Sequence, residues 1–125
     1  MTILKLDFDG MSLLEVMKSF QRDRRLLRMM RTHKISKCEI KLYKTRRGFH
    51  VYVNVFKKMS DHSVVFWQVV LGSDVEREIF NLQRILKRIP NWNVLFNTKW
   101  VNGKKVSEEK YCETIIVSCP RVIKK

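Results

Sequence analysis

Two aspartates and a histidine are the residues of this sequence whose types and spacing could do chemistry together. Asp7 and Asp9 lie two positions apart in an alternating segment, so on a β-strand they share one face, with Cα atoms about 6.6 Å apart. Paired carboxylate oxygens are ligands for Mg²⁺ or Mn²⁺. His50 could orient them, contact a triphosphate or transfer a proton. The pattern favours Asp7 and Asp9 as metal ligands and His50 as a catalytic residue, although polar strand ends are also ordinary turn chemistry.

A cationic segment precedes His50 and offers a second kind of chemistry. Its members are Lys44, Thr45, Arg46 and Arg47, followed by Gly48. Guanidinium groups and turn amides could hold phosphate oxygens here, and the alternative is a solvated hairpin tip. Tyr52 shares the expected open strand face with Tyr43 and could stack on bases.

The net charge of +14 indicates an anionic partner. Lys18 to Arg47 contains twelve Lys or Arg residues and only two acidic ones. Arg25 and Arg28 belong to a series of arginines that can line the outside of an amphipathic helix. Nucleic acid, either DNA or RNA, is the expected partner, ahead of a membrane surface or an acidic protein.

Three period-two segments predict the strands that must position these residues. They cover residues 2–9, 35–43 and 49–55, and their aliphatic sets face the core. His50, Tyr52 and Asp7 are therefore expected on the opposite face. The Asn102-Gly103 pair suits a two-residue hairpin turn, so its flanks, about 92–101 and 104–118, are expected to be two further strands.

Helical periodicity occupies the remaining segments. A capping box of Ser12 and Glu15 begins a long cationic helix that runs through Met30. A second helix is expected over 64–71, and a third over about 74–89 after a capping box of Ser73 and Glu76. The expected buried stripe of the third helix consists of Ile79, Leu82, Ile85, Leu86 and Ile89.

This order predicts an α+β fold, the ferredoxin-like or RRM-like split β-α-β-β-α-β arrangement with an additional C-terminal β-hairpin strand. The third strand should lie between the first two, antiparallel to both. A chain of 125 residues fits one domain over 1–118, followed by a basic tail over 119–125. An exposed last strand could mediate homodimerisation.

Cysteine usage and hydropathy indicate an intracellular, cytoplasmic protein. Cys38, Cys112 and Cys119 have no CxxC spacing, and their odd number argues against a disulfide framework. No apolar run approaches the length of a membrane span, so no membrane partner is expected. Size, charge and thiol usage also resemble those of small proteins of archaeal viruses and plasmids, for which the compartment would be the host cell.

Two known families share features with the central stretch. Arg47-Gly48-Phe49 is similar to the signature of RNA-recognition motifs, but there the aromatic residues after the glycine face outward, whereas here Phe49 is expected in the core. Asp7-Phe8-Asp9, followed after one helix by Tyr43 to Val51, resembles the catalytic core of archaeo-eukaryotic primases and primase-polymerases. The hallmarks of that family are an Asp-hydrophobic-Asp strand and a strand that opens Ser-x-Gly-x-x-His or similar. The resemblance covers about the first half of the chain.

The primase resemblance implies specific roles. Metal binding would fall on Asp7 and Asp9, and contacts to nucleotide phosphates on Thr45, Arg47 and His50. Lys44-Thr45 replaces the usual serine-containing segment, and Glu113 is the nearest candidate for a third carboxylate. The predicted function is therefore nucleic-acid binding by a reduced, non-catalytic primase-like sheet that needs no cofactor. The alternative is a metal-dependent nucleotidyltransferase or nuclease that uses Asp7, Asp9 and His50 with Mg²⁺ or Mn²⁺.

Overall fold

The computed structural model describes residues 2–21, 24–46, 48–93, 98–101, 104–107 and 109–118. The basic tail predicted over 119–125 lies outside these residues. The strands are β1 (Ile3–Asp9), β2 (Lys37–Lys44), β3 (Gly48–Asn54), β4 (Thr98–Val101), β5 (Lys104–Ser107) and β6 (Lys110–Ser118). The helices are α1 (Leu13–Gln21), α2 (Arg24–Thr32), α3 (Asp61–Val70) and α4 (Val75–Leu86).

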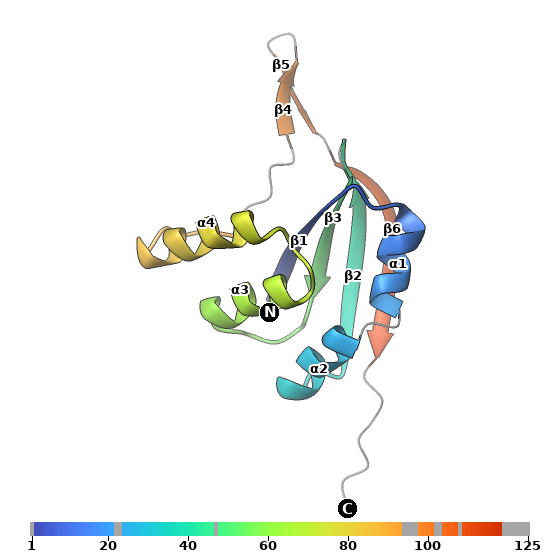
Figure 1. The fold of residues 1–125 in the computed structure, drawn as a ribbon, viewed down its shortest axis with the longest axis vertical. Coiled ribbons are helices and arrows are strands. Elements are labelled where there is room, and N and C mark those ends of the chain that lie inside the picture. The colour runs from blue at the N-terminus through green and yellow to red at the C-terminus, as the bar shows by residue number, and fades with distance from the viewer. Residues whose placement is uncertain are drawn as a thin grey trace, which may run out of the picture.

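The main sheet has four antiparallel strands in the order β1-β3-β2-β6 (Figure 1). The prediction that the third strand lies between the first two is confirmed, as is the α+β class. A complete ferredoxin-like split would also place the final strand beside β1, parallel to β3. Here β6 lies beside β2, so the split order as a whole is not established, and β1 and β6 form the two edges.

The core lies between the sheet and helices α1, α2 and α3, which cover one face (Figure 1). Strand periodicity aims the aliphatic residues of β1, β2 and β3 at these helices. The six residues expected to be buried together all belong to the core: Leu6, Phe8, Ile40, Leu42, Val51 and Val53. The helices contribute mainly Val16, Leu26, Met29, Met30, Val64, Trp67 and Leu71.

The β4–β5 hairpin is a separate two-stranded sheet. Val101 pairs with Lys104 across the Asn102-Gly103 position, as expected for a two-residue turn. The single strand predicted over 104–118 is instead divided into β5 and β6, so only its second part joins the main sheet.

The long N-terminal helix predicted from the sequence is two helices, α1 and α2. The capping box is confirmed: Glu15 N–H donates to Ser12 Oγ at 3.2 Å, and Ser12 N–H donates to Glu15 Oε1 at 3.4 Å. Arg25 and Arg28 are exposed on α2, as predicted. Among the described residues, no helix is long and apolar enough to cross a bilayer.

The predicted buried face of α4 is wrong. Ile79, Leu82 and Leu86 are exposed, Ile85 is half-buried, and Ile89 lies beyond the end of the helix, where it is also exposed. The buried residues of α4 are the polar pair Glu78 and Asn81. Its N-cap is Asp74, whose carboxylate accepts from Arg77 N–H, in place of the predicted Ser73 and Glu76 capping box.

The outer edge of β1 explains this inversion. An edge strand leaves backbone groups without a neighbouring strand, and buried groups need partners. Lys5 N–H donates to Gln68 Oε1 at 2.9 Å, Asp7 N–H donates to Ser73 Oγ at 3.4 Å, and Arg77 donates to the Lys5 carbonyl at 2.7 Å.

Glu78 holds this polar layer together. It accepts from Gln68 Nε2 at 2.6 Å, from Ser73 Oγ at 2.9 Å and from Asn81 Nδ2 at 2.9 Å, and it pairs with Arg77. Burial lowers the pKa of Arg77, and the Glu78 carboxylate raises it in part. α4 therefore turns its polar face to the edge of β1 and its apolar face outward.

Candidate nucleic-acid interface

Asp7 and His50 lie beside each other, as predicted. The two residues are direct partners in the β1–β3 register, and His50 Nε2 lies 3.7 Å from Asp7 Oδ1. His50 alternates with core residues Phe49 and Val51 and lies on the face away from the helices, yet only 5% of it is exposed. Its imidazole is enclosed by neighbouring polar side chains, which differs from the open position expected.

The nearest further carboxylate is Glu109, which sequence reasoning missed. His50 Nδ1–H donates to Glu109 Oε1 at 2.8 Å, from a residue 59 positions earlier in the chain. Glu113, the candidate considered from the sequence, is exposed on β6 opposite Leu42. Glu109 directly precedes β6, and only the pairing of β6 with β2 brings it to β3. No local pattern could have indicated that pairing.

The Asp7–His50–Glu109 cluster joins β1, β3 and the start of β6. Its imidazole lies between two carboxylates and links the three segments. Among the described residues, no group of three or more His, Cys, Asp or Glu is arranged to hold a metal ion. The side chain of Asp9, the other predicted ligand, lies outside the described part of the structure.

Three tyrosines form a row beside this cluster. The rings of Tyr43 and Tyr52 meet edge to face at 5.3 Å, and those of Tyr43 and Tyr111 at 5.7 Å. The Tyr52 hydroxyl donates to Glu109, and burial together with this carboxylate raises the pKa of Tyr52. Tyr111 is 55% exposed. The row presents aromatic surface on the helix-free face, as predicted for Tyr52, but the Tyr52 hydroxyl is already engaged.

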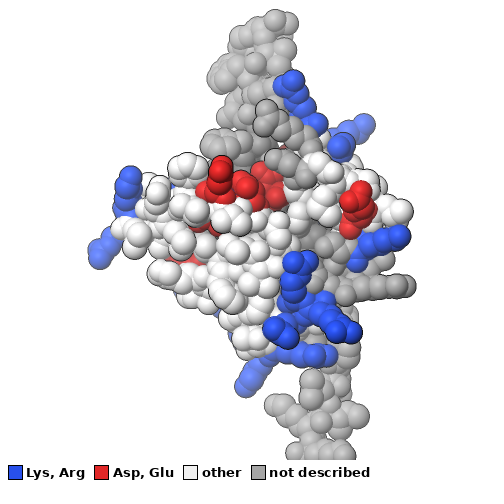
Figure 2. Space-filling model, in the orientation of Figure 1, with Lys and Arg blue, Asp and Glu red and all other residues white. Residues whose placement is uncertain are grey.

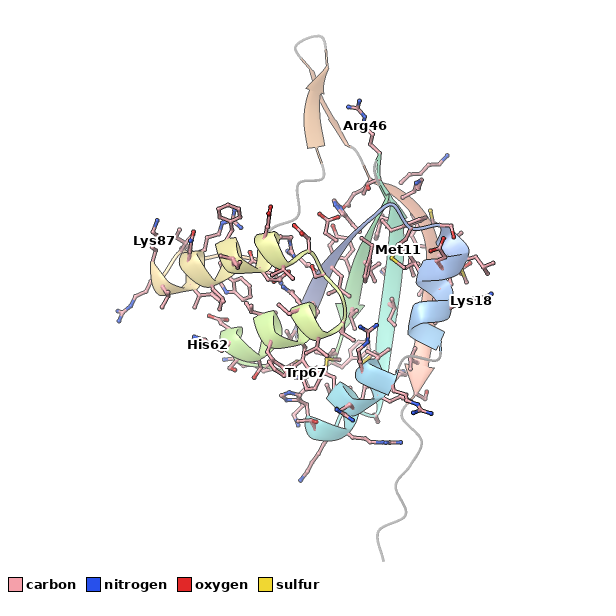
Figure 3. All side chains as sticks on the ribbon, viewed as in Figure 1. Met11, Lys18, Arg46, His62, Trp67 and Lys87 are labelled. Carbon is pink, nitrogen blue, oxygen red and sulfur yellow. The ribbon has the colours of Figure 1, made fainter. Side chains whose placement is uncertain are left out.

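The β2–β3 turn is closed by Thr45. Thr45 N–H donates to the Gly48 carbonyl at 2.9 Å, and Gly48 N–H donates to Thr45 Oγ1 at 3.2 Å. The hydroxyl predicted to contact phosphate therefore acts as an acceptor within the turn, and its O–H remains the group that could donate to a phosphate oxygen. Lys44 Nζ lies 4.9 Å from the ring centroid of Phe49, and Arg46 is exposed at the tip (Figure 3). Arg47 lies outside the described residues.

Helix α2 carries a groove lined by three arginines. Leu26, Met29 and Met30 are buried in the core, and the exposed surface of the helix carries arginine side chains together with Leu27 and Thr32. The groove, called here the arginine groove, has a volume of about 460 Å³. The described residues that line it are Arg24, Leu27, Arg28, Arg31 and Thr32. Within the described part of the chain, no carboxylate pairs with these three arginines. Their charges are therefore available to an external anion.

A second cationic hollow follows directly along the chain. Lys34 has a φ of 54° and ends α2, with Ile35 N–H donating to the Met30 carbonyl at 2.7 Å. The chain then enters β2 past a hollow of about 280 Å³, the lysine pocket, lined by Lys34, Ile35, Ser36, Lys37, Val55, Phe56 and Lys57. Figure 2 shows Lys and Arg side chains gathered around the α2 end of the molecule.

Phe56 gives the lysine pocket an aromatic surface. Its ring is 49% exposed, and Lys37 Nζ lies 5.9 Å from the ring centroid. The backbone of Phe56 has a φ of 35°, which is unfavourable for a bulky side chain. An exposed ring beside the Lys37 ammonium group can stack on a base while the lysines of the pocket contact phosphates.

The structure separates the residues that the sequence placed in one contact surface. Arg25 and Arg28 lie on α2 at one end of β2, whereas Lys44, Thr45 and Arg46 lie at its other end, by the Asp7–His50–Glu109 cluster (Figures 1 and 3). At about 3.3 Å per residue, Lys37 and Lys44 are about 23 Å apart. The molecule therefore has two cationic ends.

A scan against protein-family models, a search of curated proteins and a search of solved structures each return no match. Function is therefore inferred from the geometry of this chain.

Proposed function

We propose that this protein binds nucleic acid through its phosphate backbone, without catalysing a reaction on it. The arginine groove and the lysine pocket form the principal contact surface, and Arg46 on the β2–β3 turn makes a second contact. The sheet serves as a reduced primase-like platform of the RRM-like or ferredoxin-like kind. Counterion release makes such binding strongly dependent on salt and weakly dependent on base sequence.

The arginine groove is the observation that carries the proposal. Three guanidinium groups line one concave surface without a carboxylate partner among the described residues. A surface helix normally mixes both signs of charge, whereas α2 has no acidic residue in its first turn and a buried apolar face. Arginine forks suit phosphate oxygens because two donors can meet two acceptors.

The aromatic surfaces favour a single-stranded partner. Phe56 in the lysine pocket and Tyr111 at the end of the tyrosine row are both about half exposed. Sheet-face and pocket aromatics bind unpaired bases by stacking, which tolerates any sequence. We therefore expect single-stranded DNA or RNA to bind more tightly than a duplex of equal length.

The second candidate function is a metal-dependent nucleotidyltransferase or nuclease. The observation that favours it is Glu109, which supplies a carboxylate close to His50 and opposite Asp7. Against it, His50 is enclosed and already hydrogen-bonded. Two carboxylates with a shielded histidine are a weak arrangement for in-line phosphoryl transfer, which generally uses two metal ions.

Single substitutions in the arginine groove test the proposal. Arg28→Ala and Arg31→Ala should each lower the affinity for a 20-nucleotide strand by about three- to tenfold and reduce the salt slope by about one. The matched control is Lys18→Ala, an exposed cation on α1 that does not belong to the arginine groove or the lysine pocket (Figure 3). Fluorescence anisotropy over a salt series measures both quantities. Equal losses in all three variants would mean that only net charge matters, and the groove would have no role.

A further inference from the structure

Helix α4 carries an apolar stripe that faces away from the rest of the molecule. Its members are Val75, Ile79, Leu82 and Leu86, and their exposed fractions are 56%, 49%, 38% and 77%. Isolated exposed apolar residues are common, but a continuous row of large ones marks an interaction surface. No described residue covers this α4 stripe.

The spacing of the α4 stripe is that of a coiled-coil seam. Successive members are four, three and four residues apart, which is the alternation of the a and d positions in a heptad. At about 100° per residue, all four fall within about 60° of one another around the helix. Such a seam is suited to packing against another helix.

The α4 stripe cannot be buried by a rotation of the helix within its own domain. Glu78 and Asn81, on the flank of the helix next to the stripe, are buried and hydrogen-bonded to each other, and Glu78 also binds Gln68 of α3. Arg77 reaches the backbone of β1. Rotation of α4 about its axis would break several of these hydrogen bonds and leave buried polar groups without partners, which is strongly destabilising. Rotation of α4 therefore offers no way to bury the stripe against the described part of the domain.

We propose that α4 pairs in antiparallel orientation with α4 of a second copy of this chain. A two-fold axis between Ile79 and Leu82 makes the stripe self-complementary. It places Val75 of one copy against Leu86 of the other, and Ile79 against Leu82. Every layer then joins an a position to a d position, which is the packing of an antiparallel coiled coil, and the isologous contact closes as a dimer.

The charges at the two ends of α4 select this orientation and this partner. Asp74 and Glu76 lie at its start, and Lys87 and Arg88 follow its end, all four exposed. Antiparallel pairing brings the acidic end of each helix beside the basic end of the other, and it also opposes the helix dipoles favourably. Parallel pairing would place like charges together.

This dimer does not depend on nucleic-acid binding, and the two associations should respond differently to salt concentration. The net charge of +14 makes two copies repel one another. Salt screens this repulsion while the apolar contact persists. Dimerisation should therefore be retained or strengthened at salt concentrations that abolish binding to nucleic acid.

Sedimentation velocity over a concentration series tests the proposal. Leu86→Glu should weaken self-association at least about tenfold, because it places a carboxylate in the apolar seam. Leu14→Glu is the matched control, because Leu14 is 61% exposed on α1 and lies outside the stripe; it should leave association unchanged. Circular dichroism checks that both variants are folded, and Ile79→Glu repeats the test at a second layer.

Charge reversal then tests the orientation. Glu76→Lys should weaken the dimer, and Glu76→Lys combined with Lys87→Glu should restore it, because the two sites face each other only in antiparallel pairing. A monomer at all concentrations would overturn the proposal. A dimer that persists in Leu86→Glu would overturn it as well and would indicate the β6 edge as the interface. Binding to neutral lipid vesicles that depends on the stripe, without dimerisation, would instead assign the stripe to a membrane surface.

Discussion

His50 Nδ1–H donates to Glu109 Oε1 at 2.8 Å, although 59 residues separate them in the chain. The same carboxylate oxygen accepts the Tyr52 hydroxyl. One carboxylate at the start of β6 is thus bound twice by β3, a strand with which β6 does not pair. This contact adds a side-chain link across β2 to the backbone ladder.

Tyr52 should make stability depend on alkaline pH. Burial and Glu109 raise its pKa above the ordinary value of 10.0. The unfolded chain therefore loses this proton at lower pH than the folded protein, so the stabilisation is complete below about pH 10 and is lost as pH rises towards the folded pKa. Above about pH 10, the free energy of unfolding measured in urea should fall less steeply with rising pH in Tyr52→Phe than in the wild-type protein. Tyr111→Phe, at an exposed tyrosine, should keep the wild-type slope.

Glu78 should be one of the most sensitive polar positions. Glu78→Gln removes the counter-charge of the largely buried Arg77 and should lower the free energy of unfolding by about 3 kcal/mol. Glu76→Gln, two residues away and exposed, should change it by less than about 0.5 kcal/mol. Hydrogen exchange should show faster exchange of the Lys5 and Asp7 amides only in Glu78→Gln. Equal effects in both variants would contradict a special role for the buried carboxylate.

Gly72 and Gly10 form a natural pair of test positions. Both have positive φ, 99° and 73°, but a Cβ at Gly72 would lie 3.3 Å from Phe8 Cε1, whereas Gly10 has open space. Gly10→Ala should cost about 1 kcal/mol through backbone strain alone, and Gly72→Ala about 2 kcal/mol. Phe8→Ala should itself cost about 3 kcal/mol. The double variant Phe8→Ala, Gly72→Ala should lose less stability than the sum of the losses in the two single variants, because the two residues are in contact. Thermal and urea unfolding measure each step.

The two cationic ends predict a dependence on oligonucleotide length. The ends of β2 are about 23 Å apart. Replacing Arg46 and Arg47 together with alanine should reduce affinity and salt slope for long strands, but should leave the binding of single strands too short to reach both cationic ends unchanged. A uniform loss at every length would contradict two separate contacts.

Manganese binding separates the two candidate functions. For the binding protein we expect no Mn²⁺ uptake at millimolar concentration, no metal-stimulated extension or cleavage of nucleic acid, and unchanged affinity in Asp7→Asn. For the enzyme, Mn²⁺ should relieve the repulsion between neighbouring carboxylates and be lost in Asp7→Asn and Asp9→Asn. Isothermal titration with and without nucleotide, together with an extension assay, distinguishes these results.

Period-two alternation was sufficient to predict which faces of β1 and β3 are buried, and the crossover rule placed the end of β1 beside the start of β3. Because one face of each strand must be buried, the alternation determines which residues point together, and Asp7 meets His50 as a consequence. Periodicity failed for α4, because the apolar residues at helical spacing were expected to be buried and are exposed instead. The backbone of β1 needs polar partners, and Gln68, Ser73 and Arg77 supply them from 63 to 72 positions away. Glu109 was missed for the same reason, because its partners depend on non-local strand pairing.

The sealed edge of β1 has a consequence for the order of folding. β1 can pair with β3 as soon as the first half of the chain has collapsed, but its outer amides and carbonyl find partners only when α3 and α4 arrive. Between these events the strand presents an open edge that can recruit another unfolded chain. Refolding yield should therefore fall with protein concentration, and it should fall more steeply when Glu78, which holds the sealing side chains in position, is replaced.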